Sequence, residues 1–136
     1  MAQVTYMLDA CALIAYFRGE EGGERLVSLV EDEAHGLAIH AVNFGEVYYD
    51  FLRAGGEENA RELWLRALLL PMEIRRDLDD EFVQRVGAWK VRYSISYADA
   101  FALALAEREG VPLITTDHHE FDIIEADGTV DFFWLR

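Results

Sequence analysis

The sequence predicts an α/β fold with a mostly parallel sheet of about four to five short strands and helices on both faces. Short apolar runs alternate along the chain with segments whose apolar residues follow a helical period. The strand-like runs are continuously apolar, which is typical of strands that are covered on both faces. The chain has 136 residues, is 52% hydrophobic and shows no repeat or linker, so we expect one globular domain over residues 1–136.

Individual elements follow from local composition. β-rich apolar runs predict strands at residues 4–8, 37–40, 72–75, 113–116 and 130–135. Spacing and start signals predict helices over residues 11–17, 24–33, 43–53, 58–69 and 80–92, and one that opens at Ser96. Gly55-Gly56 separates the third helix from the fourth, and Gly110 followed by Pro112 is a strong stop for the last.

Four acidic residues fall at equivalent points of this scheme. Asp9 and Asp117 directly follow predicted strands, and Glu46 and Asp99 lie in the first turns of predicted helices. The carboxyl ends of parallel strands and the helix starts after them share one edge of the sheet, where ligands bind. Residues that are far apart in the sequence are therefore expected to converge there.

Each acid alone has a purely structural interpretation. Asn43 with Glu46, and Ser96 with Asp99, have the spacing of a capping box, and Asp9 and Asp117 are candidate N-caps. Taken together, however, four carboxylates at one edge repel each other, and helix dipoles relieve only ~0.3–1 kcal/mol each. Bound Mg²⁺ or Mn²⁺ would relieve much more, and a set of hard oxygen ligands suits those ions.

Such a metal site favours phosphodiester hydrolysis, since a divalent ion lowers the pKa of a bound water and neutralises charge in the transition state. The net charge of −14, from 26 acidic and 12 basic side chains, argues against nucleic-acid binding, because a phosphate backbone is repelled. A bound divalent ion would reverse the sign locally, and a basic partner protein could cover part of the acidic surface.

Four motifs together resemble the PIN domain family, and the match is closest to VapC toxins of prokaryotic toxin–antitoxin pairs. The motifs are the strand and acid in residues 6–14, Asn43-x-x-Glu46, residues 96–100 with Asp99, and residues 113–117 with Asp117. The resemblance runs from about residue 4 to residue 121 and implies one PIN-like nuclease domain over residues 1–136.

The resemblance implies further properties of this chain. It implies an Mg²⁺- or Mn²⁺-dependent endoribonuclease that forms a homodimer and is inhibited by a cognate antitoxin. Its metal-binding and catalytic acids match Asp9, Glu46, Asp99 and Asp117. A further catalytic position, two residues before the last acid, matches Thr115, whose hydroxyl could orient a carboxylate or a water. Many members carry Ser or Thr where this chain has Cys11, and a thiol is the weaker hydrogen-bond donor.

Other functions remain open at this point. Phosphoryl transfer, as in receiver domains, needs a lysine near the phosphoryl group, and the only lysine, Lys90, lies within a predicted helix. A PIN domain of RNA processing and a binding module without catalysis are the remaining alternatives. A single cysteine excludes an intrachain disulfide, and without a signal peptide or membrane segment we expect a cytoplasmic protein.

Several more residues have an ordinary surface interpretation that we favour. His118 and His119 are expected at an exposed helix start rather than on a metal. Arg18 and Arg53 fall near the ends of segments that begin at the acidic edge, where they could touch phosphate, but as surface arginines they need no such role. Asp122 is similarly expected in a surface turn.

Overall fold

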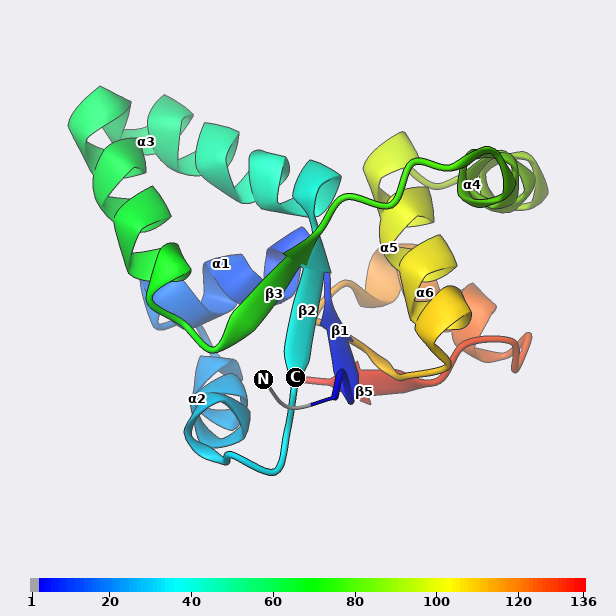
Figure 1. Cartoon of the computed structure of the whole chain (residues 1–136), viewed down its shortest axis with the longest axis horizontal. Helices are drawn as coiled ribbons and strands as arrows, with labels where there is room; N and C mark the ends of the chain where they lie inside the picture. Colours follow the sequence, from blue (N-terminus) through cyan, green and yellow to red (C-terminus); the bar gives the residue numbers. More distant parts are fainter. Residues whose placement is uncertain (1–2) are drawn as a thin grey trace.

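The computed structural model describes residues 3–136 and has the α/β architecture that the sequence predicts (Figure 1). The strands are short and lie at the predicted positions: β1 (Tyr6–Leu8), β2 (Leu37–His40), β3 (Met72–Arg75), β4 (Leu113–Thr115) and β5 (Phe132–Trp134). The helices are α1 (Ala10–Arg18), α2 (Gly23–Glu31), α3 (Ala41–Leu68), α4 (Asp80–Arg92), α5 (Tyr97–Glu109) and α6 (His118–Glu125).

The five strands form one sheet in the order β3-β2-β1-β4-β5, and every neighbouring pair is parallel. Successive residues of a strand point to opposite faces, so Met7 and Leu8 enter two different hydrophobic clusters. The cluster around Met7 packs against α4, α5 and α6, and the cluster around Leu8 packs against α1, α2 and α3. Figure 1 shows these two sets of helices on opposite sides of the sheet. The predicted covering of both faces is thereby confirmed.

The long helix α3 is bent where the sequence predicts a break. Gly56 has φ 83° and ψ −177°, a backbone conformation outside the helical region that glycine adopts at low cost. The two arms correspond to the two helices predicted over residues 43–53 and 58–69.

The predicted start of the first arm at Asn43 is wrong. The helix begins at Ala41, and His40 is its N-cap, with Nδ1 accepting a hydrogen bond from the backbone N–H of Val42 at 3.0 Å. His40 is buried and stacks on Phe82, so a ring that the core holds in place does the capping. Asn43 is therefore inside the first turn, and the capping box predicted for Asn43 and Glu46 does not form.

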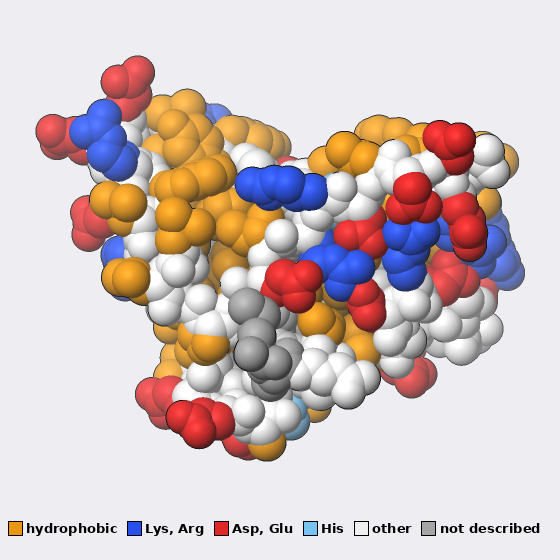
Figure 2. Space-filling model, viewed as in Figure 1, with side chains coloured by type: hydrophobic (Ala, Val, Ile, Leu, Met, Phe, Trp, Pro, Cys, Tyr) orange, Lys and Arg blue, Asp and Glu red, His pale blue; other side chains and the backbone are white. Residues whose placement is uncertain are grey.

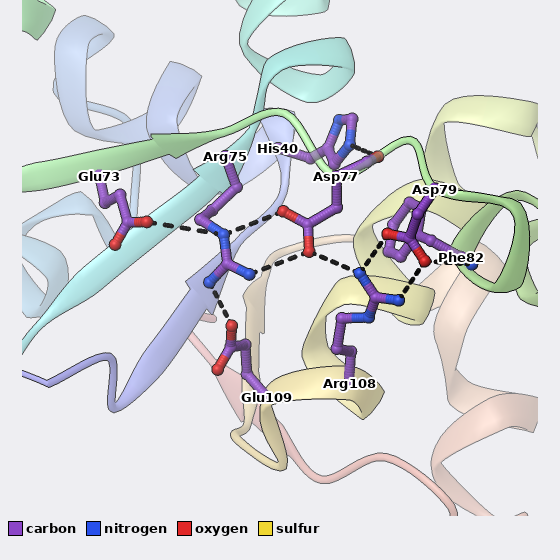
Figure 3. A network of polar contacts seen from close by, with 8 residues as sticks. All are labelled: His40, Glu73, Arg75, Asp77, Asp79, Phe82, Arg108 and Glu109. Carbon is purple, nitrogen blue, oxygen red and sulfur yellow. Dashed lines mark hydrogen bonds and ion pairs between the residues drawn. The ribbon is translucent and has the colours of Figure 1, made fainter.

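An ion-pair network fixes the segment between β3 and α4 (Figure 3). Arg108 on α5 donates to Asp77 at 2.9 Å and to Asp79 at 2.7 Å, and Asp79 is the N-cap of α4. Arg75 donates to the same Asp77 at 2.9 and 3.0 Å, and its other nitrogen pairs with Glu109. The network ties the carboxyl end of β3 to the end of α5, and so fixes two of the elements that border the acidic edge.

Within residues 3–136, no helix is both long enough and apolar enough to cross a membrane.

Candidate functional site

The four predicted acids all come from the carboxyl edge of the sheet. Asp9 follows β1 and caps α1, and Asp117 follows β4 and caps α6. Because β1 and β4 are paired, these two acids follow the ends of neighbouring strands. Glu46 lies on α3 after β2, but outside the first turn in which it was predicted, because the helix begins at Ala41; Asp99 lies in the first turn of α5 as predicted. Figure 2 shows the outline of the molecule notched between the α3 side and the side of α4 and α5, above this edge.

Asp9 is the most enclosed of these acids, with 2% of its surface exposed. Its Oδ1 accepts a hydrogen bond from the backbone N–H of Ala12 at 2.8 Å, and its Oδ2 accepts one from the hydroxyl of Thr115. Burial raises the pKa of Asp9 to about 7, because a charged carboxylate loses its hydration there. The two hydrogen bonds lower this pKa, and the negative charges of Asp99 and Asp117 raise it further.

Thr115 connects the first acid to the last. Its side chain is fully buried, and its Oγ1 accepts a hydrogen bond from the backbone N–H of Asp117 at 3.0 Å while donating to Asp9. One hydroxyl therefore fixes the carboxylate of Asp9 relative to the backbone that carries Asp117. This contact is consistent with the orienting role that the family resemblance implies for Thr115.

Glu46 and Asp99 are half-buried and interact with each other. Burial is the main cause of the raised pKa of Glu46, and the charge of Asp99 adds to it. The pKa of Asp99 is raised by burial first, and also by the charges of Asp117 and Glu120. Ser96 is the N-cap of α5, and its hydroxyl accepts from the backbone N–H of Asp99 at 3.0 Å, as predicted. The helix cap at Ser96 therefore forms although Asp99 also belongs to the acidic edge.

The Cys11 thiol lies among the same charges. Its pKa is raised by burial first and then by the charges of all four predicted acids, with Asp9 the largest of the four. Asp9, Glu46, Asp99 and Asp117 therefore all act electrostatically on the Cys11 thiol, in keeping with their shared place at the carboxyl edge of the sheet.

Glu120 is an acid near this edge that the sequence analysis missed. It lies in the first turn of α6, and its backbone N–H donates to Oδ1 of Asp117 at 3.1 Å. Its three-residue spacing from Asp117 repeats the cap-plus-three pattern seen at Ser96 and Asp99, which was the available signal.

The donor chemistry of the edge fits a hard divalent cation, because it offers carboxylate oxygens whose charges are otherwise uncompensated. In residues 3–136, however, no three Asp, Glu, His or Cys side chains form a cluster that could hold one ion. Mg²⁺ retains several waters and needs only one or two direct carboxylates, so it does not require such a cluster.

Other candidates from the sequence lie outside this cluster. His118 stacks on Trp134, and its ring nitrogens lie 2.7 Å from Asp122 Oδ1 and from the carbonyl oxygen of Arg136. Arg18 and Arg53 both pair with Asp50, at 2.8 and 2.9 Å. These contacts agree with the surface roles that we favoured, except that Asp122 is exposed on α6 and not in a turn.

The fold and this edge define a class of protein, an α/β domain that gathers carboxylates at the carboxyl ends of parallel strands. The model of the PIN domain family matches residues 6–126. The chain belongs to the PIN domain family, which confirms the resemblance seen in the sequence motifs. A search of curated proteins gave no match.

Solved structures of toxin–antitoxin proteins are similar in fold. VapBC2 from Rickettsia felis, bound to a DNA fragment from its promoter, has a TM-score of 0.73 at 16% identity, over 96% of this chain and 98% of that chain. VapBC from Salmonella typhimurium, bound to DNA, has a TM-score of 0.72 at 15% identity, with 98% and 99% covered. VapC20 from Mycobacterium tuberculosis, a toxin that cleaves the sarcin-ricin loop, has a TM-score of 0.69 at 16% identity, with 90% and 95% covered.

Proposed function

We propose that this chain is a Mg²⁺- or Mn²⁺-dependent endoribonuclease that hydrolyses RNA phosphodiester bonds, and that it is the toxin of a VapBC-like toxin–antitoxin pair. The observation that carries the proposal is the position of Asp9, Glu46, Asp99 and Asp117 at the ligand-binding edge of a PIN fold, where all four acids raise the pKa of Cys11. Buried carboxylates without a counter-charge are costly in free energy, and a divalent cation supplies that charge.

The residues have distinct roles in this proposal. Asp9, Glu46, Asp99 and Asp117 would hold the ion and the waters that it retains. The hydroxyl of Thr115 keeps the Asp9 carboxylate oriented toward the edge, since it already donates to Oδ2. When bound, the ion lowers the pKa of a water and stabilises the charge that develops on the phosphate. The protein contributes the enclosed, low-dielectric surroundings of Asp9 and a fixed carboxylate geometry.

The proposal also accounts for the strong negative charge of the chain. With a net charge of −14, the surface attracts a basic partner and repels RNA at long range. A basic antitoxin would bind such a surface readily, and RNA would depend on the divalent ion for its approach. The structural similarity to VapBC complexes supports an antitoxin as the partner, and we place a homodimer and a cytoplasmic location in the same proposal.

The test is cleavage of a mixed single-stranded RNA pool by the purified protein in Mg²⁺, in Mn²⁺ and in EDTA. Wild-type protein should cleave only with metal, and Asp99→Asn should not cleave. Asp131→Asn is a matched control, because Asp131 is an exposed acid that directly precedes β5, at the opposite edge of the sheet. Cleavage by Asp99→Asn at a rate comparable to wild type would refute the assignment of the site.

A binding-only PIN domain is the second candidate, and the lack of a three-ligand cluster within residues 3–136 is the observation that favours it. The two candidates differ in their response to metal. A functional site gains stability with Mg²⁺ or Mn²⁺ by mass action, whereas a binding-only domain has no metal-dependent rise in melting temperature.

A further inference from the structure

A buried amide joins two of the helices that carry the acids. Asn43 lies in the first turn of α3, three residues before Glu46, and its side chain is fully buried. Its Nδ2 donates a hydrogen bond to the backbone carbonyl of Ala98 at 2.9 Å. Ala98 directly precedes Asp99 on α5. One side chain therefore spans from the turn before Glu46 to the residue before Asp99.

The orientation of this amide is fixed by its partner. A carbonyl oxygen only accepts hydrogen bonds, so the nitrogen of the Asn43 side chain faces Ala98. An amide nitrogen carries two hydrogens, and the carbonyl of Ala98 accepts one of them. Asn43 thus joins the start of α3, which carries Glu46, to the backbone beside Asp99 on α5.

The remaining atom of this amide is unsatisfied. Oδ1 of Asn43 is buried and has no hydrogen-bond partner in the part of the chain that the structure describes. Leaving a buried acceptor unpaired is unfavourable for folding. A carbonyl inside a helix already accepts the N–H four residues further on, so the fold does not need Asn43 to satisfy Ala98. The asparagine is therefore better explained by the acids on either side of it than by stability.

We propose that Asn43 is a positioning residue that sets the separation and orientation of the Glu46 and Asp99 carboxylates, and thereby the affinity of the site for a divalent cation. This inference rests on the proposed function, because it assigns Asn43 a role at the same metal site. It does not place Asn43 in contact with the ion or the substrate.

The test measures Mn²⁺ binding by titration calorimetry, at a temperature where circular dichroism shows each variant to be folded. Asn43→Ala removes the hydrogen bond to the carbonyl of Ala98, and Asn43→Asp keeps the shape but replaces the donor with a further carboxylate near Glu46. We expect the half-saturating Mn²⁺ concentration to rise about tenfold or more for Asn43→Ala, as is usual when a group that orients a metal ligand is lost. Asn43→Ser, which retains a hydroxyl donor, provides a second variant if Asn43→Asp does not fold.

The chain contains its own control for the loss of a hydrogen bond from an asparagine side chain to a backbone carbonyl, at a half-buried position. Asn59, the only other asparagine, lies on the second arm of α3, and its Nδ2 donates to the backbone carbonyl of Phe51 at 2.8 Å. Asn59→Ala removes the same kind of hydrogen bond from the same helix, close to the bend at Gly56. It should lower the melting temperature and leave the half-saturating Mn²⁺ concentration within twofold of wild type.

A double-mutant cycle with Glu46→Gln separates positioning from general destabilisation. If Asn43 acts through Glu46, Asn43→Ala should change Mn²⁺ binding much less in the Glu46→Gln background than in wild type. Folded Asn43 variants that bind Mn²⁺ like wild type, or effects that simply add in the cycle, would overturn this inference alone. A wild-type protein that binds no Mn²⁺ and cleaves no RNA would overturn the proposed function as well.

Discussion

The hydroxyl of Thr115 donates a hydrogen bond to Oδ2 of Asp9, although the two residues lie 106 positions apart in the sequence. The hydroxyl oxygen of Thr115 also accepts a hydrogen bond from the backbone N–H of Asp117 at 3.0 Å. Both contacts are enclosed, since Thr115 and Asp9 are buried. The acidic edge is therefore held by a defined contact between neighbouring strand ends, and the acids do not converge by sheet topology alone.

Thr115→Val should impair the site while keeping the side-chain shape. The variant loses the donor to Asp9, so the pKa of Asp9 should rise further, and about 1–3 kcal/mol of stability should be lost with the unpaired acceptor. We expect RNA cleavage to fall by about 10- to 100-fold. Thr115→Ser keeps the hydroxyl and should retain most of the activity. Equal cleavage by the Val and Ser variants would show that the hydroxyl does not matter.

The raised pKa of Asp9 predicts how the stability of metal-free protein depends on pH. Its ordinary pKa is 3.8 and its folded value is about 7, so between these values the folded state binds more protons than the unfolded state. Asp9 therefore lowers the free energy of unfolding as pH rises through this range, by on the order of 4 kcal/mol. This loss of stability is absent below the pKa of Asp9 in the unfolded state and complete above its pKa in the folded state.

Asp9→Asn isolates this effect from other titrating groups. His40 opposes it, because its pKa is lowered by burial and its contribution to stability is lost as pH falls. Urea unfolding in EDTA at pH 5 and pH 8 should therefore be compared between wild type and Asp9→Asn. We expect the variant to gain stability relative to wild type at pH 8, and less at pH 5. An equal difference at both pH values would contradict the raised pKa.

Much of the fold could be predicted because its strands are continuous apolar runs between clear stop signals. The limits of β2 and β3 match the predicted residues 37–40 and 72–75, whereas β1 and β5 are shorter than the predicted runs 4–8 and 130–135. The strand order depends on how the crossovers pack, and no local pattern contains that information.

The sequence predicted the positions of the acids better than their surroundings. Asp9, Asp117 and Ser96 cap helices as predicted, because a short polar side chain after a strand forms such a cap locally. Asn43 has the same type of side chain but makes a contact 55 residues away. Its role depends on tertiary structure, and the local capping pattern therefore suggested the wrong partner.

Arg108→Met should destabilise the protein without affecting the acidic edge. Arg108 holds the pKa of Asp79 down to about 2 by donating to that carboxylate, and it also binds Asp77 (Figure 3). Methionine keeps an apolar stem but removes the guanidinium group, which also lies over the ring of Phe82 at 5.1 Å from its centroid. Because the pairs are partly exposed, we expect a modest fall in melting temperature that is smaller at 1 M salt.

RNA cleavage by Arg108→Met at a temperature where it is folded should match wild type. The ion-pair network involves α5, which also carries Asp99. A loss of activity with an unchanged melting temperature would therefore mean that the network positions the acids.

Cys11→Ser should increase cleavage, because it restores the hydroxyl that many VapC-like proteins carry two positions after the first acid. The Cys11 thiol lies among the four acids and is held protonated by burial and by their charges, so it offers them only a weak hydrogen-bond donor. A hydroxyl hydrogen bond contributes about 0.5–1.5 kcal/mol, which corresponds to a rate increase of about three- to tenfold if it is made in the transition state. Cys11→Ala removes the donor without replacing it and should be no faster than wild type. If serine and alanine at this position gave the same rate, Cys11 would be a packing residue, and orientation of the acids would rest on Thr115 and the helix caps.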